Sequence, residues 1–299
     1  MAGLNGCELQ TRSYDTNVYS FRPALARMAY ERYGPTDWER DEPGPLEALH
    51  ELHAWLNRMG LNTTDLSQVH TRDTDQTSQH YTDLYFAFHD LRPAFRSTYL
   101  SFVEGVVQPL FDETVVYQTV PTLRVHMPGN VAVGEYHTDA KYGHPAEAVN
   151  FWVPVTGAHD TNALYIQTSE DDMPRARNAN YGEYLIFDGV GLPHGNERNT
   201  TGQTRVSFDF RVMPESQFNP SDETSINTGL VFRTGEGGYY SLLDDDSLAA
   251  ERERIAEASR PTREWEERLN RQWAEEEERA NREPAERLRR LLRAIRLLR

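Results

Sequence analysis

The sequence predicts a mainly β fold with flanking helices, and the distribution of apolar residues carries this prediction. Short segments rich in β-branched and aromatic residues follow one another between positions 115 and 213, and clusters of Gly, Asn, Asp and Pro separate them. Many short strands with turns at this spacing are typical of an antiparallel sandwich or jelly roll. Helical periodicity appears before and after this region, which predicts helical support on the N-terminal side and a helical tail.

Two segments before the β region have the pattern of amphipathic helices. Apolar residues recur every three or four positions in Leu46–Met59 and again in Pro93–Phe111, which is rich in aromatic residues. A helix with one apolar stripe packs that stripe against a core. We therefore expect both helices to cover the outside of the sheet.

The expected strands follow in order along the chain. They are Val115–Met127, Gly134–Asp139, Ala148–Thr156, Ala163–Thr168, Tyr184–Phe187 and Arg205–Met213. The last of them alternates strictly between apolar residues and the polar residues Arg205, Ser207, Asp209 and Arg211. Such alternation predicts a strand with one face in the core and a polar opposite face.

Two histidines and one aspartate have the spacing of a metal site. His137 and Asp139 are two positions apart, so on a strand both point to the same side. His194 follows the apolar run that ends at Phe187 and lies in a turn-rich segment. A lone histidine is more often structural than a ligand, but two imidazoles and one carboxylate form the ligand set of non-haem Fe(II) oxygenases.

The strand that begins at Arg205 supplies an anion-binding pair. A guanidinium binds a carboxylate through two parallel hydrogen bonds, and the Ser207 hydroxyl, two residues further on the same face, can add another. Only a turn separates this strand from His194. An organic diacid is therefore expected to bridge the metal and Arg205.

The pattern His137-x-Asp139, His194, Arg205-x-Ser207 resembles the HxD…H…RxS pattern of the Fe(II)/2-oxoglutarate-dependent oxygenases. More narrowly, the region from about Val116 to Pro214 is similar to oxygenases of antibiotic biosynthesis of the streptomycin and hygromycin kind, which include orthoester-forming enzymes. The resemblance implies a double-stranded β-helix core, the cupin-like jelly roll.

The same resemblance implies a cofactor set and a reaction class. Fe(II) would be held by the two histidines and Asp139, while 2-oxoglutarate would place its far carboxylate on Arg205 and Ser207. With O2 as oxidant, a C–H bond of an aminoglycoside or another sugar-containing natural product would be oxidised, by hydroxylation or by oxidative ring closure to an orthoester. Asp139 argues against a halogenase, which leaves a small residue at this position.

Other residues have weaker assignments. Asn150 is expected either to contact the keto-acid end of 2-oxoglutarate or to be a structural amide, and Arg124 either to bind a cofactor carboxylate or to form a structural ion pair. Loops beside metal sites commonly bind substrate. The candidates for gripping polyol or ammonium groups are Tyr142, His144, Glu147 and Asp160.

Composition and charge narrow the class of protein. No apolar run approaches the roughly 20 residues of a membrane span, no signal peptide is recognisable, and the single cysteine, Cys7, fits a reducing cytoplasm. The tail from Ser247 carries 14 Arg and 12 Glu, so the total charge of −16 leaves −18 on the body. Such a body repels nucleic acid and favours cationic small molecules, although the acidic surface serves solubility equally well. The family resemblance implies a polyhydroxylated glycoside.

The C-terminal region has a composition of its own. After a predicted flexible break at Thr234–Gly238, the chain becomes rich in Glu, Arg, Ala and Leu, with interruptions expected at Pro261 and Pro284. We expect an oxygenase domain over 1–246 and a charged helical tail over 247–299. The tail is expected to pack on the body or to form a homodimer through its helices, with a membrane surface or an acidic partner as the alternative.

Two other functional classes remain open. A cupin-like metal isomerase or epimerase would act on sugars without O2 and would need no Arg205 anchor. A non-catalytic sugar- or metal-binding jelly roll would turn over no co-substrate at all. Binding of 2-oxoglutarate separates the oxygenase from both.

Overall fold

A computed structural model describes residues 8–25, 49–54, 93–132, 136–169, 173–225 and 229–258. The chain divides into two compact units, Met1–Glu251 and Arg252–Arg299, and all the described strands lie in the first. No helix among the described residues is long and apolar enough to cross a bilayer.

The strands are short, as the spacing of turns predicts. They are β1 (Gln10–Ser13), β2 (Val115–Gln118), β3 (Thr122–His126), β4 (Val149–Pro154), β5 (Leu164–Ile166), β6 (Arg175–Arg177), β7 (Glu183–Phe187), β8 (His194–Gly195), β9 (Arg205–Pro214) and β10 (Tyr240–Leu242). The helical elements are η2 (Leu49–Glu51), α5 (Pro93–Phe102), η5 (Val103–Val107), η6 (Gln108–Leu110), η7 (Asp139–Tyr142), η8 (Asp160–Asn162) and η9 (Glu215–Gln217).

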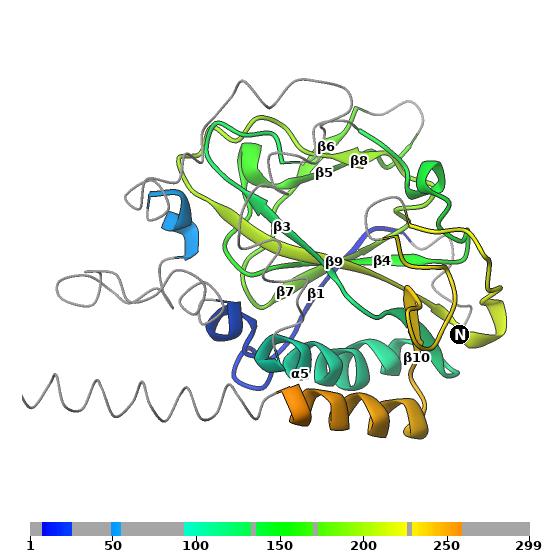
Figure 1. Cartoon of the computed structure of the whole chain (residues 1–299). Coiled ribbons are helices and arrows are strands. Elements are labelled where there is room, and N and C mark those ends of the chain that lie inside the picture. The colour runs from blue at the N-terminus through cyan, green and yellow to red at the C-terminus, as the bar shows by residue number, and fades with distance from the viewer. Residues whose placement is uncertain are drawn as a thin grey trace, which may run out of the picture. The chain divides into compact units, whose positions relative to one another are not determined.

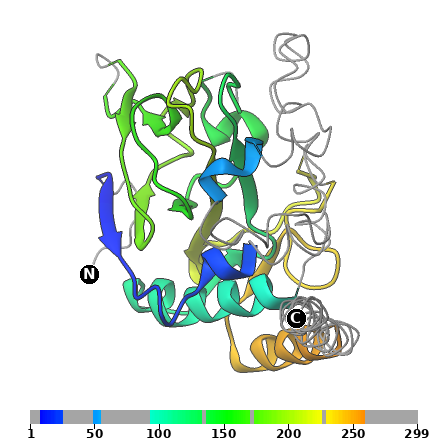
Figure 2. The same cartoon turned by 90° about the vertical axis from the view of Figure 1, so that its left-hand side faces the viewer.

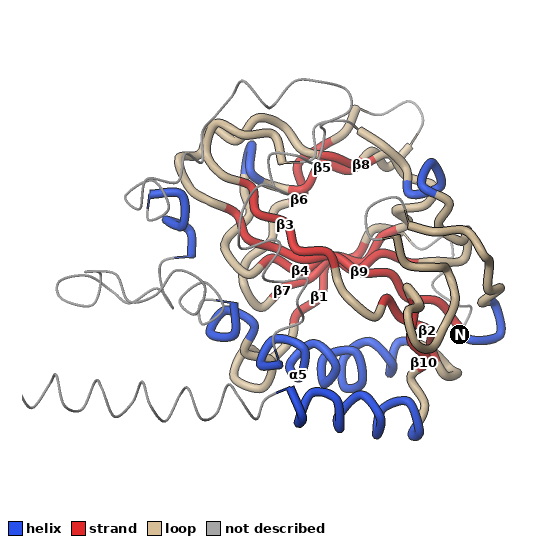
Figure 3. The backbone as a smooth tube through the Cα atoms, in the orientation of Figure 1, coloured by secondary structure: helices blue, strands red, loops and turns tan. Residues whose placement is uncertain are grey.

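The strands form two antiparallel sheets. The larger has the order β1-β7-β4-β9-β2-β10, with β3 also paired to β9, and the smaller has the order β6-β5-β8. The smaller sheet lies on one side of the larger sheet and α5 lies on the other (Figures 1 and 3). A view turned by 90° keeps this separation (Figure 2). Arg205 and Asp209 on the polar face of β9 line the same cavity as Leu164, His194 and Gly195 of the smaller sheet.

The apolar face of β9 builds the core under α5. Phe208 lies edge-on to Phe95 at 5.3 Å between ring centroids, and Phe210 lies edge-on to Tyr99 at 5.1 Å. Edge-to-face pairs of this kind add stability beyond their buried area. The predicted alternation is confirmed on this face, but all ten residues of β9 are buried because its polar face lines an internal site.

The helix expected over Pro93–Phe111 is present, with a change of winding along it. The α-helical part α5 continues as the π-helical turn η5 and the 3-10 turn η6. Of the helix expected over Leu46–Met59, only 49–54 lies within the described residues, and it is helical there.

Two strand predictions need correction. Val115–Met127 is two strands, β2 and β3, because the chain turns at residues 119–121, where Pro121 has no N–H for a ladder. Gly134–Asp139 is wrong as a strand in its described part, since His137 makes only an isolated bridge and Asp139 begins the 3-10 turn η7. The 3-10 turn that begins at Asp139 ends the extended backbone after Thr138.

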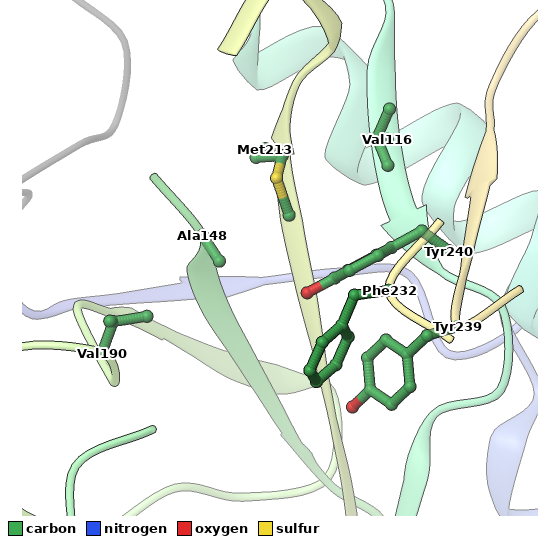
Figure 4. Close-up of a cluster of buried hydrophobic side chains, with 7 residues drawn as sticks. All are labelled: Val116, Ala148, Val190, Met213, Phe232, Tyr239 and Tyr240. Carbon is green, nitrogen blue, oxygen red and sulfur yellow. The ribbon is translucent and has the colours of Figure 1, made fainter. Parts of the chain in front are cut away.

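The predicted break at Thr234–Gly238 lies between buried aromatic residues, and its flexibility stays a prediction. Phe232, Tyr239 and Tyr240 are buried together with Met213 and Val116 in a second core (Figure 4). Gly235 and Gly237 have positive φ values, so the glycines serve tight turns between buried aromatic residues. In the tail, residues 245–258 are helical, while Pro261, Pro284 and the rest lie outside the described residues. The division at 246/247 stays a prediction.

His126 at the end of β3 makes the stability of the fold depend on pH. It is fully buried, its Nε2 donates to the Asn130 carbonyl at 2.9 Å, and burial together with nearby Arg205 lowers its pKa to about 3. Below the unfolded-state pKa of about 6.5 only the unfolded chain takes up this proton. The free energy of unfolding therefore decreases as the pH is lowered, by up to about 1.4 kcal/mol per pH unit. His126→Gln keeps the donor without the titration. Urea unfolding between about pH 4 and pH 6 is expected to show a shallower pH dependence in this variant, and equal slopes would contradict the prediction.

Candidate metal centre

The three predicted metal ligands meet in one place. His137 and His194 face each other across an antiparallel bridge whose two N–H···O bonds measure 3.0 and 2.9 Å. The Asp139 N–H donates to the carbonyl of Gly189 at 2.8 Å, which fixes the start of η7 beside the histidines. A turn thus places Asp139, where a strand was expected.

The ligand atoms of the triad are correctly arranged for a single ion. Oδ1 of Asp139 lies 3.9 Å from Nε2 of His137 and 3.8 Å from Nε2 of His194, and all three candidate ligand atoms lie within 4.8 Å of one another. All three side chains are buried. Nδ1 of His194 donates to the Leu192 carbonyl at 3.0 Å, which fixes the tautomer and leaves Nε2 for a metal.

The second oxygen of Asp139 faces away from the histidines and accepts hydrogen bonds. Oδ2 lies 2.7 Å from Nδ2 of Asn150, 2.8 Å from Nε of Arg211 and 2.7 Å from Nη2 of Arg211. Burial raises the pKa of the Asp139 carboxyl, but the Arg211 cation, the two nearby histidines His194 and His144 and the hydrogen bond from Asn150 together more than offset this and hold the pKa below its usual range. The carboxylate is therefore ionised and oriented before a metal arrives.

Gly189 makes room for the amide of Asn150. A Cβ at this position would lie 2.4 Å from Nδ2 of Asn150. The same residue offers its carbonyl to Asp139, so one loop after β7 sets both the backbone of the ligand and the amide that orients its carboxylate.

Arg205 is a buried cation without an anionic partner in the described part of the chain. Its Nη1 donates to the carbonyl of Asn162 at 3.1 Å and to Oδ1 of Asn196 at 2.8 Å, while its Nε has no partner. Burial and the neighbouring Arg124 cation lower its pKa to about 9. The hydroxyl of Ser207, on the same face of β9, is also buried without a partner. These unpartnered donors fit a carboxylate.

Arg205 and the two histidines of the triad line one cavity of roughly 380 Å³, a volume that includes its open mouth. The cavity is lined by Arg124, His137, Asn150, Trp152, Leu164, Phe187, His194, Gly195, Asn196, Arg205 and Asp209. Two nitrogen donors and one oxygen donor suit a divalent first-row metal, and the unpartnered donors beyond them suit the far end of a diacid. The residues present therefore fit both groups.

The two uncertain cofactor residues have structural partners. Nε of Arg124 lies 2.7 Å from Oδ1 of Asp209, so the ion pair left open by the sequence is present, although Arg124 also lines the cavity. Asn150 donates to Asp139, and its Oδ1 has no partner. Contact of either residue with 2-oxoglutarate stays a prediction.

The four substrate candidates lie at different distances from the triad, and none of them lines the cavity. Tyr142 packs edge-on against His137 at 5.2 Å between ring centroids, and His144 packs on Phe232 and Tyr239. Burial, with Arg211 close by, lowers the pKa of His144 to about 3, so it is neutral. Glu147 is partly exposed, and Asp160 is 81 % exposed beside His159.

Arg211, Asp209, Trp152 and Asn196 are site residues to which the sequence argument gave no role. Arg211 and Asp209 share the polar face of β9 with Arg205, so the alternation that identified Arg205 also placed them at the site. Trp152 lies under the Arg205 guanidinium at 5.5 Å. Nothing in the local sequence of Asn196 marks it as a partner of Arg205.

A buried His-Asp-His triad inside an antiparallel β fold is the arrangement of a metal-binding protein. Comparison with known proteins narrows the class of protein further. The chain is 41% identical over 179 residues to the streptomycin biosynthesis protein StrG of Streptomyces griseus. The aligned region covers 59% of this chain and 82% of StrG. The chain belongs to the family of StrG. This confirms the predicted resemblance to proteins of streptomycin-type antibiotic biosynthesis. No family model matches the chain.

Solved structures that resemble the chain do so at low similarity. The non-heme monooxygenase ThoJ has 13% identity and a TM-score of 0.39, with 86% of this chain and 98% of ThoJ covered. The non-heme alpha-ketoglutarate-dependent carbocyclase SnoK from nogalamycin biosynthesis has 13% identity and a TM-score of 0.39, with 81% and 94% covered. At these scores neither structure assigns a residue or a reaction to this chain.

Proposed function

We propose that the protein is an Fe(II)/2-oxoglutarate-dependent oxygenase of antibiotic biosynthesis. One observation carries the proposal: both histidines of the buried His-Asp-His triad line the same cavity as a buried arginine that forms no ion pair with a carboxylate among the described residues. Burying an unpaired cation is costly, so Arg205 indicates that an anion binds beside it. A metal isomerase acting on sugars would need no such anchor. The two facing sheets are proposed to form a double-stranded β-helix.

The residues of the chain divide the work of the site. His137, His194 and Oδ1 of Asp139 hold Fe(II) on one face and leave the opposite positions open. Arg205 and Ser207 hold the far carboxylate of 2-oxoglutarate, and Trp152 supports the guanidinium. Bound together, the iron, 2-oxoglutarate and O2 supply oxidative decarboxylation to succinate and CO2 and the oxidation of a substrate C–H bond.

The proposed substrate is an aminoglycoside or another sugar-containing natural product. The role of StrG in streptomycin biosynthesis and the charge of −18 on the body support a cationic, polyhydroxylated molecule. Hydroxylation and orthoester-forming ring closure use the same site, and product mass separates them, since one adds an oxygen atom and the other removes two hydrogens. Preference for a neutral oligosaccharide over every aminoglycoside tested would contradict the charge argument.

The remaining proposals concern the surroundings of the enzyme. We place it in the cytoplasm, because it has a single cysteine and Fe(II) needs reducing conditions. A homodimer through the predicted helical tail is proposed from the spacing of apolar residues in its sequence, at Leu288, Leu291, Leu292, Ile295 and Leu298. Light scattering of the full chain beside a chain ending at residue 258 tests it.

The test of the proposed function is an anaerobic titration of the apoprotein with Fe(II) and 2-oxoglutarate. We expect the weak visible charge-transfer band of a metal-bound keto acid in the wild type and not in His194→Ala. The variant is expected to stay folded, because His194 is held by its backbone bridge and its removal strands no charge. A wild type that binds metal but gives no band with 2-oxoglutarate would favour the isomerase or the binding protein.

A further inference from the structure

The two oxygens of the Asp139 carboxylate have opposite environments. Oδ1 is directed toward the Nε2 atoms of both histidines, whereas Oδ2 receives the amide of Asn150 and two nitrogens of Arg211. A carboxylate oxygen has two lone-pair sites. Three donors within 2.8 Å occupy all of the acceptor capacity of Oδ2. Only Oδ1 remains available to a metal.

Arg211 is itself held rigidly. It lies opposite Asn150 in the register of β9 and β4, so both donors reach Oδ2 from neighbouring strands. Its Nη1 donates to Oε1 of Gln118 at 3.0 Å and to the Tyr239 hydroxyl at 3.3 Å. Gln118 is fixed in turn by its bond to the Val120 carbonyl at 2.7 Å. The guanidinium therefore cannot turn away from Oδ2 without breaking these bonds.

We propose that Arg211 is a positioning residue that keeps Asp139 a one-oxygen metal ligand. Without it, the carboxylate could rotate and bind through both oxygens, which would fill a position opposite the triad. In the proposed oxygenase, those positions receive 2-oxoglutarate and O2. The inference rests on the proposed function for what uses the open positions, but the ligand mode itself is a property of the chain and the metal.

A simpler role for Arg211 would be to neutralise a buried anion. The two roles differ in what lysine can replace. Lysine supplies the same charge as a single rotatable ammonium, while arginine directs two N–H groups of a rigid plane onto one oxygen. Charge alone is restored by Arg211→Lys, but the fixed geometry is not.

The test uses Co(II) as the probe, because its ligand-field absorption reports coordination number without any co-substrate. We expect the Co(II) spectrum of Arg211→Gln to shift from that of the wild type, and that of Arg211→Lys to resemble the glutamine variant. The matched control is Arg22→Gln, which removes a half-buried arginine that donates to the Val155 carbonyl and lies over the Tyr181 ring. Its Co(II) spectrum is expected to match the wild type.

An unchanged spectrum in folded Arg211→Gln, or full restoration of the wild-type spectrum by lysine, overturns the proposal. If neither variant folds, Gln118→Leu removes an acceptor of Arg211 and is expected to shift the spectrum in the same direction, and no shift there overturns the proposal too. A shifted Co(II) spectrum with no keto-acid band in the iron titration would retain the role of Arg211 and reject the oxygenase. An unchanged Co(II) spectrum together with a keto-acid band in the iron titration would reject the role of Arg211 and retain the oxygenase.

Discussion

Replacing Arg205 with methionine is expected to weaken the binding of 2-oxoglutarate by about thirtyfold or more while metal binding persists. Truncating one partner of a buried, hydrogen-bonded charge pair costs about 2–5 kcal/mol, and each 1.4 kcal/mol is a factor of ten. The metal ligands come from other segments, so Co(II) affinity should change little. Calorimetric titration of the Co(II) protein with 2-oxoglutarate measures both quantities.

The stability of the same variant separates a co-substrate anchor from a structural arginine. Arg205 forms no ion pair with a carboxylate in the described part of the chain, and Asp209 acts on it only at longer range. Methionine therefore removes a buried charge at the cost of stranding two acceptors, Asn162 and Asn196. We expect the free energy of unfolding of the apoprotein to change by less than about 2 kcal/mol. In Arg124→Met, Asp209 loses its close partner, and a loss of about 3 kcal/mol or more is expected. A larger loss in Arg205→Met than in Arg124→Met would make Arg205 structural.

The strand β9 shows how far the sequence could be taken. Its period-two alternation placed Phe208 and Phe210 in the core and Arg205 at the site, and both faces lie as predicted. Alternation assigns a residue to a face but does not choose its partner. That Arg211 contacts Asp139, and Arg124 contacts Asp209, depends on the register of three strands and on a turn far away in the sequence.

The predicted metal ligands lie close together, but the expected geometry of this segment was wrong. A bridge from His137 to His194 and the 3-10 turn at Asp139 bring the side chains together, rather than the alternation of one strand. The segment around Phe232 and Tyr240 also depends on contacts that are distant in the sequence. Its glycines indicate turns, and only tertiary contacts with Val116 and Met213 show that its aromatic residues are buried.

Phe210→Ala is expected to be the most destabilising single change in the core behind the site. Phe210 is fully buried, and its ring contacts Tyr99 at 5.1 Å and Phe151 at 5.2 Å, so it links α5 to two strands of the larger sheet. Truncating a buried phenylalanine leaves a cavity and costs about 3–5 kcal/mol. Urea unfolding at neutral pH measures the loss.

The matched control is Val18→Ala, which trims a side chain that is 64% exposed and should change the free energy of unfolding by less than about 0.5 kcal/mol. Because Phe210 lies between Asp209 and Arg211 on β9, its loss should also loosen the strand that carries the ion pairs of the site. Co(II) binding by Phe210→Ala is therefore expected to weaken while the protein is still folded. If the free energy of unfolding of Phe210→Ala falls by less than about 1 kcal/mol, the aromatic layer rearranges to fill the space. In that case the packing of α5 is not what keeps the polar face of β9 in place.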